Sequence, residues 1–191
     1  LYPMEHPYVE TGPLPELAGE TEEISHPILR HQDRAMYFRQ WANRYAFGSY
    51  RHDPIPIDPD EIPDHEESQE TPAIRTFAPG YATDAIAPAV EMIPCLGDAE
   101  LVYRMGGIFS FTPDGFPILG ESPQTKGFWS AQAVWITHAG GVGKAVAEWI
   151  VEGAPGIDLR ECDIARFHPH SYGRRYVRAR ASQQYREVYD I

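Results

Sequence analysis

A glycine-rich segment, Ala139-Gly-Gly-Val-Gly143, follows an apolar run and opens a pattern of helical periodicity. Such a segment brings several backbone N–H groups and the positive end of a helix dipole to one point. Gly140 and Gly141 carry no Cβ atoms, which permits a ligand to approach their backbone closely. The segment therefore suits an anion or the electron-rich edge of a cofactor. Close packing of the helix on the preceding strand is the alternative explanation of these glycines.

Other motifs with a chemical meaning are incomplete. Gly143-Lys144 is similar to the end of a nucleotide-binding P-loop, but His138 replaces the first glycine and Ala145 replaces the hydroxyl residue that would bind Mg²⁺. A dinucleotide-binding fingerprint would need a third small residue at Val146. His65-Glu-Glu lacks the second histidine of a zinc helix. Spacing alone thus predicts no metal site and does not require an enzyme.

The composition is that of an acidic globular protein. The chain has 191 residues, of which 42% are hydrophobic, and a formal net charge of −12. Nucleic acids and anionic membranes bind basic surfaces, so we expect neither as a partner. Cys95 and Cys162 have no metal-like or redox-like spacing, which favours a reducing compartment such as the cytoplasm over a disulfide framework. No segment approaches the ~20 apolar residues that span a membrane.

Alternating aromatic and β-branched residues predict an antiparallel sheet in the first half of the chain. Residues 6–11 form one expected strand, and residues 35–41 and 44–50 form a hairpin around a polar turn. A strand has a side-chain period of two, so Tyr37 and Arg39 should lie on the same face of the hairpin.

The remaining segments are expected to mix loops, helices and strands. Residues 53–72 hold five prolines and eight acidic residues, which is typical of an exposed loop. The other patterns predict a helix over 81–93, a strand over 98–104, paired strands within 106–120, a buried strand over 128–136, a helix over 142–152 that stops at Gly153, and weak helical character over 177–188. The predicted fold class is therefore α+β.

Eight blocks of sequence carry a resemblance to known proteins. They are residues 4–8, 27–33, 37–39, 44–50, 107–115, 119–122, 133–138 and 159–167. Together they resemble the later half of the flavin-binding region in the dimethylglycine oxidase, dimethylglycine dehydrogenase and sarcosine dehydrogenase family. This family belongs to the D-amino-acid-oxidase-like flavoproteins, and the bacterial oxidase branch is the most similar. Several blocks in the family's order are far more specific than any single motif.

The resemblance implies the architecture of a larger flavoprotein. Residues 1–105 would form part of an antiparallel substrate-binding sheet domain, and residues 106–165 would supply the closing strand and helix of a Rossmann-like FAD domain. Residues 166–191 would lead toward a C-terminal folate-binding domain. The first half of the FAD domain and the folate domain would be the chain's partners, and an oligomer is compatible. We therefore expect a fragment of a larger fold that is inactive alone, in the cytoplasm or, in a eukaryote, the mitochondrial matrix.

The resemblance also implies oxidation of a small N-methylated amino acid, dimethylglycine or sarcosine. Electrons leave a methyl carbon for FAD, which gives an iminium. That carbon passes to tetrahydrofolate or is released as formaldehyde. Any covalent attachment of FAD would use a residue outside this chain. Two alternatives stay open: a flavin enzyme for another secondary or tertiary amine, and a non-catalytic flavin-fold assembly module.

By the same resemblance, His6 and Tyr37 match the family's active-site pair beside the substrate amine, with Tyr37 also at the flavin. The implied FAD contacts lie on the family's C-terminal FAD-contact strand and in the glycine-rich turn, and they are Val134, Trp135, Ile136, Thr137, Gly140 and Gly141. A histidine suits removal of a proton from a substrate ammonium near neutral pH, and a tyrosine hydroxyl can orient it. Purely structural roles for both residues are the alternative.

Arg39 is a further candidate for the substrate site. A guanidinium group on the face of Tyr37 could bind a substrate carboxylate through two hydrogen bonds. An ion pair with one of the many acidic residues among residues 1–100 is the alternative.

Overall fold

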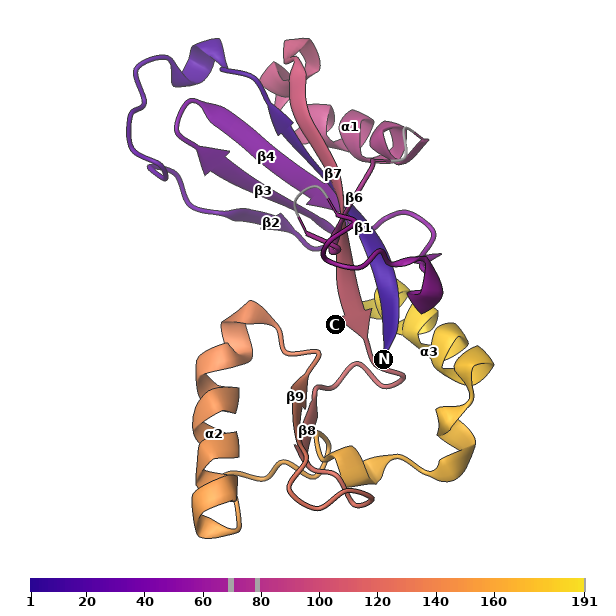
Figure 1. The fold of residues 1–191 in the computed structure, drawn as a ribbon. Coiled ribbons are helices and arrows are strands. Elements are labelled where there is room, and N and C mark those ends of the chain that lie inside the picture. Colours follow the sequence, from indigo (N-terminus) through magenta and orange to yellow (C-terminus); the bar gives the residue numbers. More distant parts are fainter. Residues whose placement is uncertain (69–70, 78–79, 191) are drawn as a thin grey trace. The chain divides into compact units, whose positions relative to one another are not determined.

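The structure, a computed structural model, describes residues 1–68, 71–77 and 80–190, without the side chains of residues 81–84 (Figure 1). It divides into two compact units, which are described separately. Unit 1 comprises Leu1–Tyr2 and Ser110–Gln184, and unit 2 comprises Pro3–Phe109 and Tyr185–Ile191.

Unit 2 is built on a sheet with the strand order β2-β3-β4-β1-β7-β6, and β5 pairs with β1. The strands are β1 Tyr2–Thr11, β2 Leu29–His31, β3 Met36–Trp41, β4 Arg44–Ser49, β5 Ile55–Pro56, β6 Ile74–Arg75 and β7 Leu101–Phe111. The pairs β2–β3, β3–β4, β4–β1, β1–β5 and β6–β7 are antiparallel. The predicted α+β class and antiparallel sheet are confirmed, as is the hairpin that turns between Trp41 and Arg44.

One face of this sheet carries the core of unit 2. The buried cluster joins Met36, Phe38 and Phe47 of the hairpin to Ala85 and Ala89 of helix α1 (Gly80–Met92). The helix predicted over residues 81–93 is confirmed. Side chains along β3 alternate between buried and half-buried, so Tyr37 and Arg39 share the face opposite this core, as predicted.

Unit 1 contains the ribbon of β8 (Ile118–Glu121) and β9 (Trp129–Gln132), helix α2 (Ala139–Glu152) and most of α3 (Arg174–Glu187). Gly153 ends α2 with a left-handed φ of 82°, as the sequence predicts. The short 3-10 helices of both units are η1 Pro15–Leu17, η2 Pro59–Glu61, η3 Pro94–Asp98, η4 Ile136–His138, η5 Ile164–Arg166 and η6 Pro169–Tyr172. Within the described parts of the chain, no helix is long and apolar enough to cross a membrane.

Two strand predictions are wrong in part. The strands of residues 106–120 do not pair with each other, because β7 belongs to the large sheet while β8 pairs antiparallel with β9. The buried strand predicted over 128–136 covers only Trp129–Gln132. Ala133 has a left-handed φ of 54°, which ends the extended backbone, and the chain then turns into η4.

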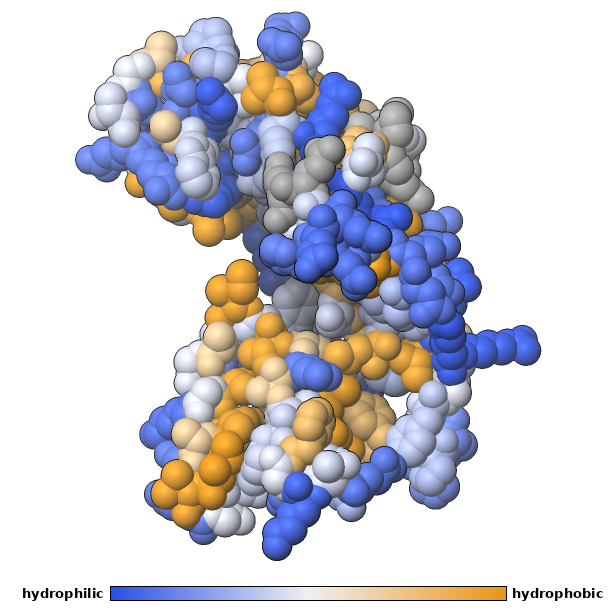
Figure 2. All heavy atoms as spheres, viewed as in Figure 1, coloured by the Kyte–Doolittle hydropathy of each residue, from blue (hydrophilic) through white to orange (hydrophobic). Residues whose placement is uncertain are grey.

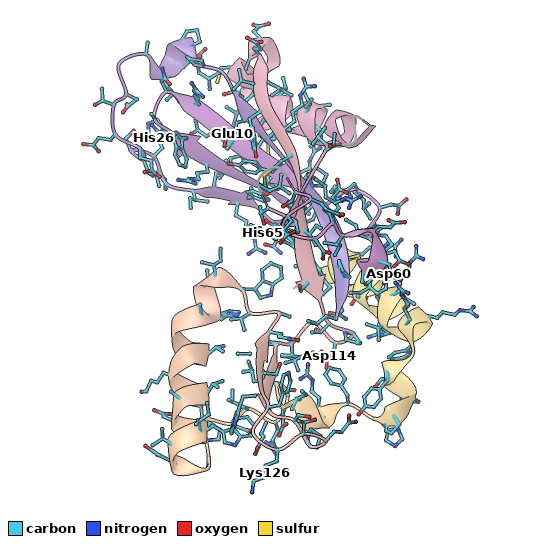
Figure 3. The ribbon with its side chains drawn as sticks, in the orientation of Figure 1. Glu10, His26, Asp60, His65, Asp114 and Lys126 are labelled. Carbon is cyan, nitrogen blue, oxygen red and sulfur yellow. The ribbon has the colours of Figure 1, made fainter. Side chains whose placement is uncertain are left out.

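Unit 1 contains a bidentate ion pair next to β7 and an exposed apolar surface on helix α2. Asp114, labelled in Figure 3, follows β7 and accepts two hydrogen bonds from Arg166, at 2.7 and 3.0 Å. The bidentate pair holds the pKa of the Asp114 carboxyl below its usual range against the opposing effect of burial. Apolar side chains gather over α2 in Figure 2, where Ile150 is 53% and Val151 is 82% exposed.

Candidate active site

The candidate site lies on the face of the sheet opposite the core of unit 2. Tyr8 of β1, Gly48 of β4 and Tyr37 of β3 occupy one row across the three strands. A Cβ atom on Gly48 would overlap the ring and hydroxyl of Tyr37. The glycine therefore allows the Tyr37 side chain to lie across β4 toward β1. There its hydroxyl is 2.9 Å from Nε2 of His6.

His6 is enclosed on all sides. Its ring stacks on Tyr50, with centroids 4.1 Å apart, and on Phe109, with centroids 5.3 Å apart. Its second nitrogen, Nδ1, is 2.7 Å from the hydroxyl of Tyr185. Only 2% of the residue is exposed. Because both ring nitrogens have partners and the residue is buried, His6 is placed to reach a ligand through a hydroxyl rather than by direct contact.

The surroundings of His6 keep its imidazole neutral. Burial, followed by the nearby His52 ring, lowers the pKa of His6 to about 3. Desolvation thus disfavours the His6 cation, and the assignment of His6 to removal of the substrate proton stays a prediction. Burial also raises the pKa of the Tyr37 hydroxyl well above its usual value, with smaller contributions from Tyr50 and Tyr8. Both groups are thus hydrogen-bonding partners in their neutral forms at pH 7.

The hydrogen bonds continue beyond His6. The Tyr185 hydroxyl is 2.8 Å from Nε2 of His52, and Nδ1 of His52 is 2.8 Å from the backbone carbonyl oxygen of Asp53. We call the four side chains of Tyr37, His6, Tyr185 and His52 the His–Tyr chain. It joins two strands of the sheet, the segment after β4 and the end of α3, all within unit 2.

Sequence reasoning missed half of this arrangement. Tyr185 is 179 positions from His6, and nothing in the arginine- and tyrosine-rich tail indicates which tyrosine faces the sheet. His52 follows the predicted hairpin without any motif around it. One signal was available: a glycine within a strand pattern indicates close approach of another group, and Gly48 is such a residue.

Arg39 shares the face of Tyr37 but has another partner. Its guanidinium donates to Glu23 at 2.6 Å and lies over the Trp41 ring, 4.3 Å from the ring centroid. This is the sheet ion pair that competes with the predicted substrate contact.

The predicted FAD-contact residues belong to unit 1. Val134 and Trp135 follow the end of β9, and Trp135 packs edge-on against Phe111 with centroids 6.0 Å apart. Ile136 and Thr137 lie in η4, where Ile136 is 95% exposed. The four residues are therefore in a loop and a 3-10 turn rather than a strand. The left-handed backbone of Ala133 ends the strand before them.

The glycines at the start of α2 have free space around them. Apart from its chain neighbours and the backbone of α2 itself, a Cβ atom on Gly140 or Gly141 would meet no atom of the described residues within 4 Å. His138, the N-cap residue, makes no side-chain capping hydrogen bond. Among the described residues, packing gives no reason for these two glycines, and the alternative of close helix packing has no support there. An open helix N-terminus with unshielded backbone fits an anionic or electron-rich group such as the flavin of FAD.

The family follows from comparison of the whole chain. The family model described as "FAD dependent oxidoreductase" matches residues 1–149, and the model described as "FAD dependent oxidoreductase central domain" matches residues 152–191. The chain belongs to the FAD-dependent oxidoreductase family. The resemblance drawn from the eight blocks is thereby confirmed.

Two relatives of this FAD-dependent oxidoreductase have names that state a methylated amine as the substrate. Mitochondrial dimethylglycine dehydrogenase of Mus musculus is 30% identical over 97% of this chain. 4-Methylaminobutanoate oxidase (formaldehyde-forming) of Paenarthrobacter nicotinovorans is 31% identical over 99% of it. The chain spans 21% and 22% of these two relatives, about a fifth of their length.

A solved structure shares the fold. L-Proline dehydrogenase from P. horikoshii superimposes with a TM-score of 0.65 and 19% identity, over 87% of this chain and 40% of that one. At this identity the likeness concerns the fold alone.

Proposed function

We propose that this chain supplies the substrate-facing sheet of a FAD-dependent enzyme that oxidises an N-methylated glycine, dimethylglycine or sarcosine, to an iminium. The observation that carries the proposal is the Tyr37 hydroxyl, held 2.9 Å from His6 by a strand row that includes Gly48. A hydroxyl fixed in this way can meet a substrate amine in one defined orientation. The family match supplies the reaction class.

Tyr37 would contact the amine, and His6 would hold Tyr37. Oxidation of a carbon next to nitrogen requires the nitrogen lone pair, so an ammonium substrate must first lose its proton. The neutral His6 imidazole accepts the Tyr37 hydrogen at Nε2 and leaves the hydroxyl oxygen's lone pairs for the ammonium N–H. Tyr37 is thus the proposed catalytic residue, and His6 acts through it.

FAD, when bound, takes up the electrons that leave the substrate carbon. In this chain the backbone N–H groups at Gly140 and Gly141 would bind the electron-rich edge of the flavin ring, with Val134, Trp135, Ile136 and Thr137 lining the approach. The free space at both glycines supports this assignment.

The remaining features of the enzyme are proposed with it. Residues 1–105 would be the substrate domain, 106–165 would complete the FAD domain, and 166–191 would lead to a folate domain. The methyl carbon would pass to tetrahydrofolate there or leave as formaldehyde. The protein would be cytoplasmic, or mitochondrial in a eukaryote, and the isolated chain inactive.

A second candidate substrate class has specific support. The relative named 4-methylaminobutanoate oxidase is as similar to this chain as dimethylglycine dehydrogenase is, at 31% against 30% identity. The methylated amine could therefore carry its carboxylate on a longer chain. Both candidates use the same contact between Tyr37 and the amine.

The test is the anaerobic bleaching of the flavin in the full-length protein, and stopped-flow absorbance monitors it. Dimethylglycine, sarcosine and 4-methylaminobutanoate are offered separately, with glycine as the unmethylated control. Bleaching by dimethylglycine or sarcosine, with little effect of the other compounds, supports the proposal. Preferential bleaching by 4-methylaminobutanoate selects the second class. A colourless protein that does not bind added FAD contradicts both and favours an assembly module.

A further inference from the structure

The outer end of the His–Tyr chain fixes the direction of its hydrogen bonds. The backbone carbonyl oxygen of Asp53 can only accept, so Nδ1 of His52 must carry the hydrogen in the 2.8 Å contact. In a neutral His52, Nε2 is then an acceptor and receives the hydroxyl hydrogen of Tyr185. The direction is set by a backbone atom that cannot change its role.

The hydrogen bonds at the inner end of the His–Tyr chain have a fixed direction too. Because the Tyr185 hydrogen is directed at His52, its oxygen accepts from Nδ1–H of His6. Nε2 of His6 is then an acceptor for the hydroxyl of Tyr37. Each side chain between Tyr37 and the Asp53 carbonyl both donates and accepts, at distances from 2.7 to 2.9 Å.

We propose that the His–Tyr chain is a proton relay, which carries the proton of the substrate ammonium from Tyr37 to His52. The relay rests on the proposed function, because it needs an amine at Tyr37. It assigns roles to two residues, Tyr185 and His52, that act through other side chains and are therefore positioning residues.

The proton steps balance without any oxidant. The ammonium N–H bond breaks and its proton joins the Tyr37 oxygen, while the Tyr37 hydroxyl proton passes to Nε2 of His6. The Nδ1 proton of His6 passes to Tyr185, and the Tyr185 hydroxyl proton passes to Nε2 of His52. The substrate has lost one proton and His52 has become an imidazolium. The three hydrogen bonds that join the four side chains now point the opposite way, His6 has changed tautomer, and Nδ1 of His52 still donates to the Asp53 carbonyl oxygen.

The position of His52 explains why the charge ends there. An imidazolium at His6 would lie beside two aromatic rings in a residue that is 2% exposed, whereas His52 is 9% exposed and is followed by the exposed Asp53. The low pKa of His6 agrees with a proton that passes through it without staying.

Other charged groups border the relay. Burial is the main cause of the raised pKa of Tyr185, and Glu5 of β1 adds a smaller contribution. Glu5 is ion-paired with Arg75 of β6 at 3.6 Å. The Arg186 guanidinium of α3 lies 3.4 Å from the Asp53 carboxylate. On the side of Tyr50 and Tyr189, Arg30 lies over the Tyr189 ring, 4.0 Å from the ring centroid. The anions at Asp53 and Glu5 favour a cation at His52, while Arg186 opposes it.

The first test determines which nitrogen of each histidine carries the hydrogen, and it requires no catalytic turnover. Nitrogen NMR of the full-length FAD-loaded protein, labelled with ¹⁵N in histidine, distinguishes the two neutral tautomers. We expect His6 and His52 both to carry hydrogen on Nδ1 at pH 8. Hydrogen on Nε2 of His6 under these conditions overturns the relay, whatever the enzyme oxidises.

The second test separates proton transfer from structure. His52→Gln keeps an oxygen that accepts from Tyr185 and an amide N–H that donates to Asp53, but it cannot take a proton. We expect the His6 tautomer to stay unchanged and flavin reduction to slow by at least about tenfold near neutral pH. The rate should recover as the pH approaches the pKa of the free amine, because substrate then arrives deprotonated.

Two further variants complete the design. Tyr185→Phe interrupts the relay in its middle and should give the same slow, alkali-rescued reduction. Tyr45→Phe removes a hydroxyl from a tyrosine that packs against the core on the other face, and it should behave as wild type. Wild-type reduction rates and pH profiles in both His52→Gln and Tyr185→Phe overturn the relay and leave the proposed function standing. A wild-type protein that oxidises none of the amines overturns the proposed function instead.

Discussion

The ring of Tyr37 lies across Gly48, the residue paired with it on the neighbouring strand, and this contact brings the Tyr37 hydroxyl to His6. Three strands are needed for this: β3 holds the tyrosine, β4 provides the gap and β1 holds the histidine. Because Gly48 has no side chain, the Tyr37 ring can cross β4 and contact His6.

Gly48→Ala should close this gap. The new methyl group would overlap the Tyr37 ring, so the ring must move and its hydrogen bond to His6 should break. Overpacking of this kind costs about 1–3 kcal/mol. We expect a lower melting temperature and slower flavin reduction in the full-length protein, measured by calorimetry and stopped flow.

The matched control for this change is Gly173→Ala. Gly173 has an ordinary φ of −63°, and a Cβ atom added there would meet no atom of the described residues within 4 Å beyond its chain neighbours, so alanine fits there without displacement. Equal behaviour of the two variants would show that the contact between Tyr37 and Gly48 is not required.

Tyr37→Phe should affect chemistry and leave the fold intact. The substitution keeps the ring over Gly48 and removes only the oxygen that meets His6. FAD content and thermal stability should barely change, while flavin reduction should slow by at least about tenfold, or about 1.4 kcal/mol. Loss of FAD or early melting with unchanged chemistry would make Tyr37 a structural residue.

Local patterns predicted most of the sheet but little of what surrounds His6. The alternating pattern of β3 correctly predicted that Tyr37 lies on the face opposite the core, because strand geometry alone decides on which face a side chain lies. The roles of Tyr50, Tyr185 and His52 depend on contacts between distant segments, which no local pattern encodes. The family resemblance identified the pair of His6 and Tyr37, but the low pKa of His6 required the burial that only the fold reveals.

The strand error after β9 has a similar cause. The apolar run of Val134, Trp135 and Ile136 has the composition of a buried strand. One residue, Ala133, with a left-handed φ that alanine seldom adopts, turns the chain before that run. Sequence periodicity cannot detect such a turn when no glycine or asparagine marks it.

Arg39→Lys distinguishes the ion pair from the proposed substrate contact. Because the guanidinium is engaged with Glu23 and Trp41, we expect an unchanged KM for substrate. The pair with Glu23 is partly exposed, so its loss should cost only ~0.2–1 kcal/mol of stability. Steady-state kinetics with dimethylglycine measures this directly. A sharp rise in KM with kcat unchanged would instead assign Arg39 to the substrate carboxylate.

His6 should make the stability of the protein depend on pH. The unfolded chain binds a proton at an ordinary histidine pKa of about 6.5, whereas the folded pKa of His6 is about 3. Between these values the unfolded state binds more protons, so the free energy of unfolding falls as the pH falls. The contribution is fully present above pH 6.5 and decreases by about 1.4 kcal/mol for each pH unit from there down to about pH 3, where both states bind the proton.

The comparison is with His6→Gln, whose amide does not titrate. We expect the urea midpoint of the wild-type full-length protein to fall more steeply between pH 7 and pH 5 than that of the variant, because all other groups titrate in both. Far-UV circular dichroism at each pH follows the unfolding. Parallel pH dependences would mean that His6 takes up a proton in the folded protein near pH 6.5, which its burial opposes.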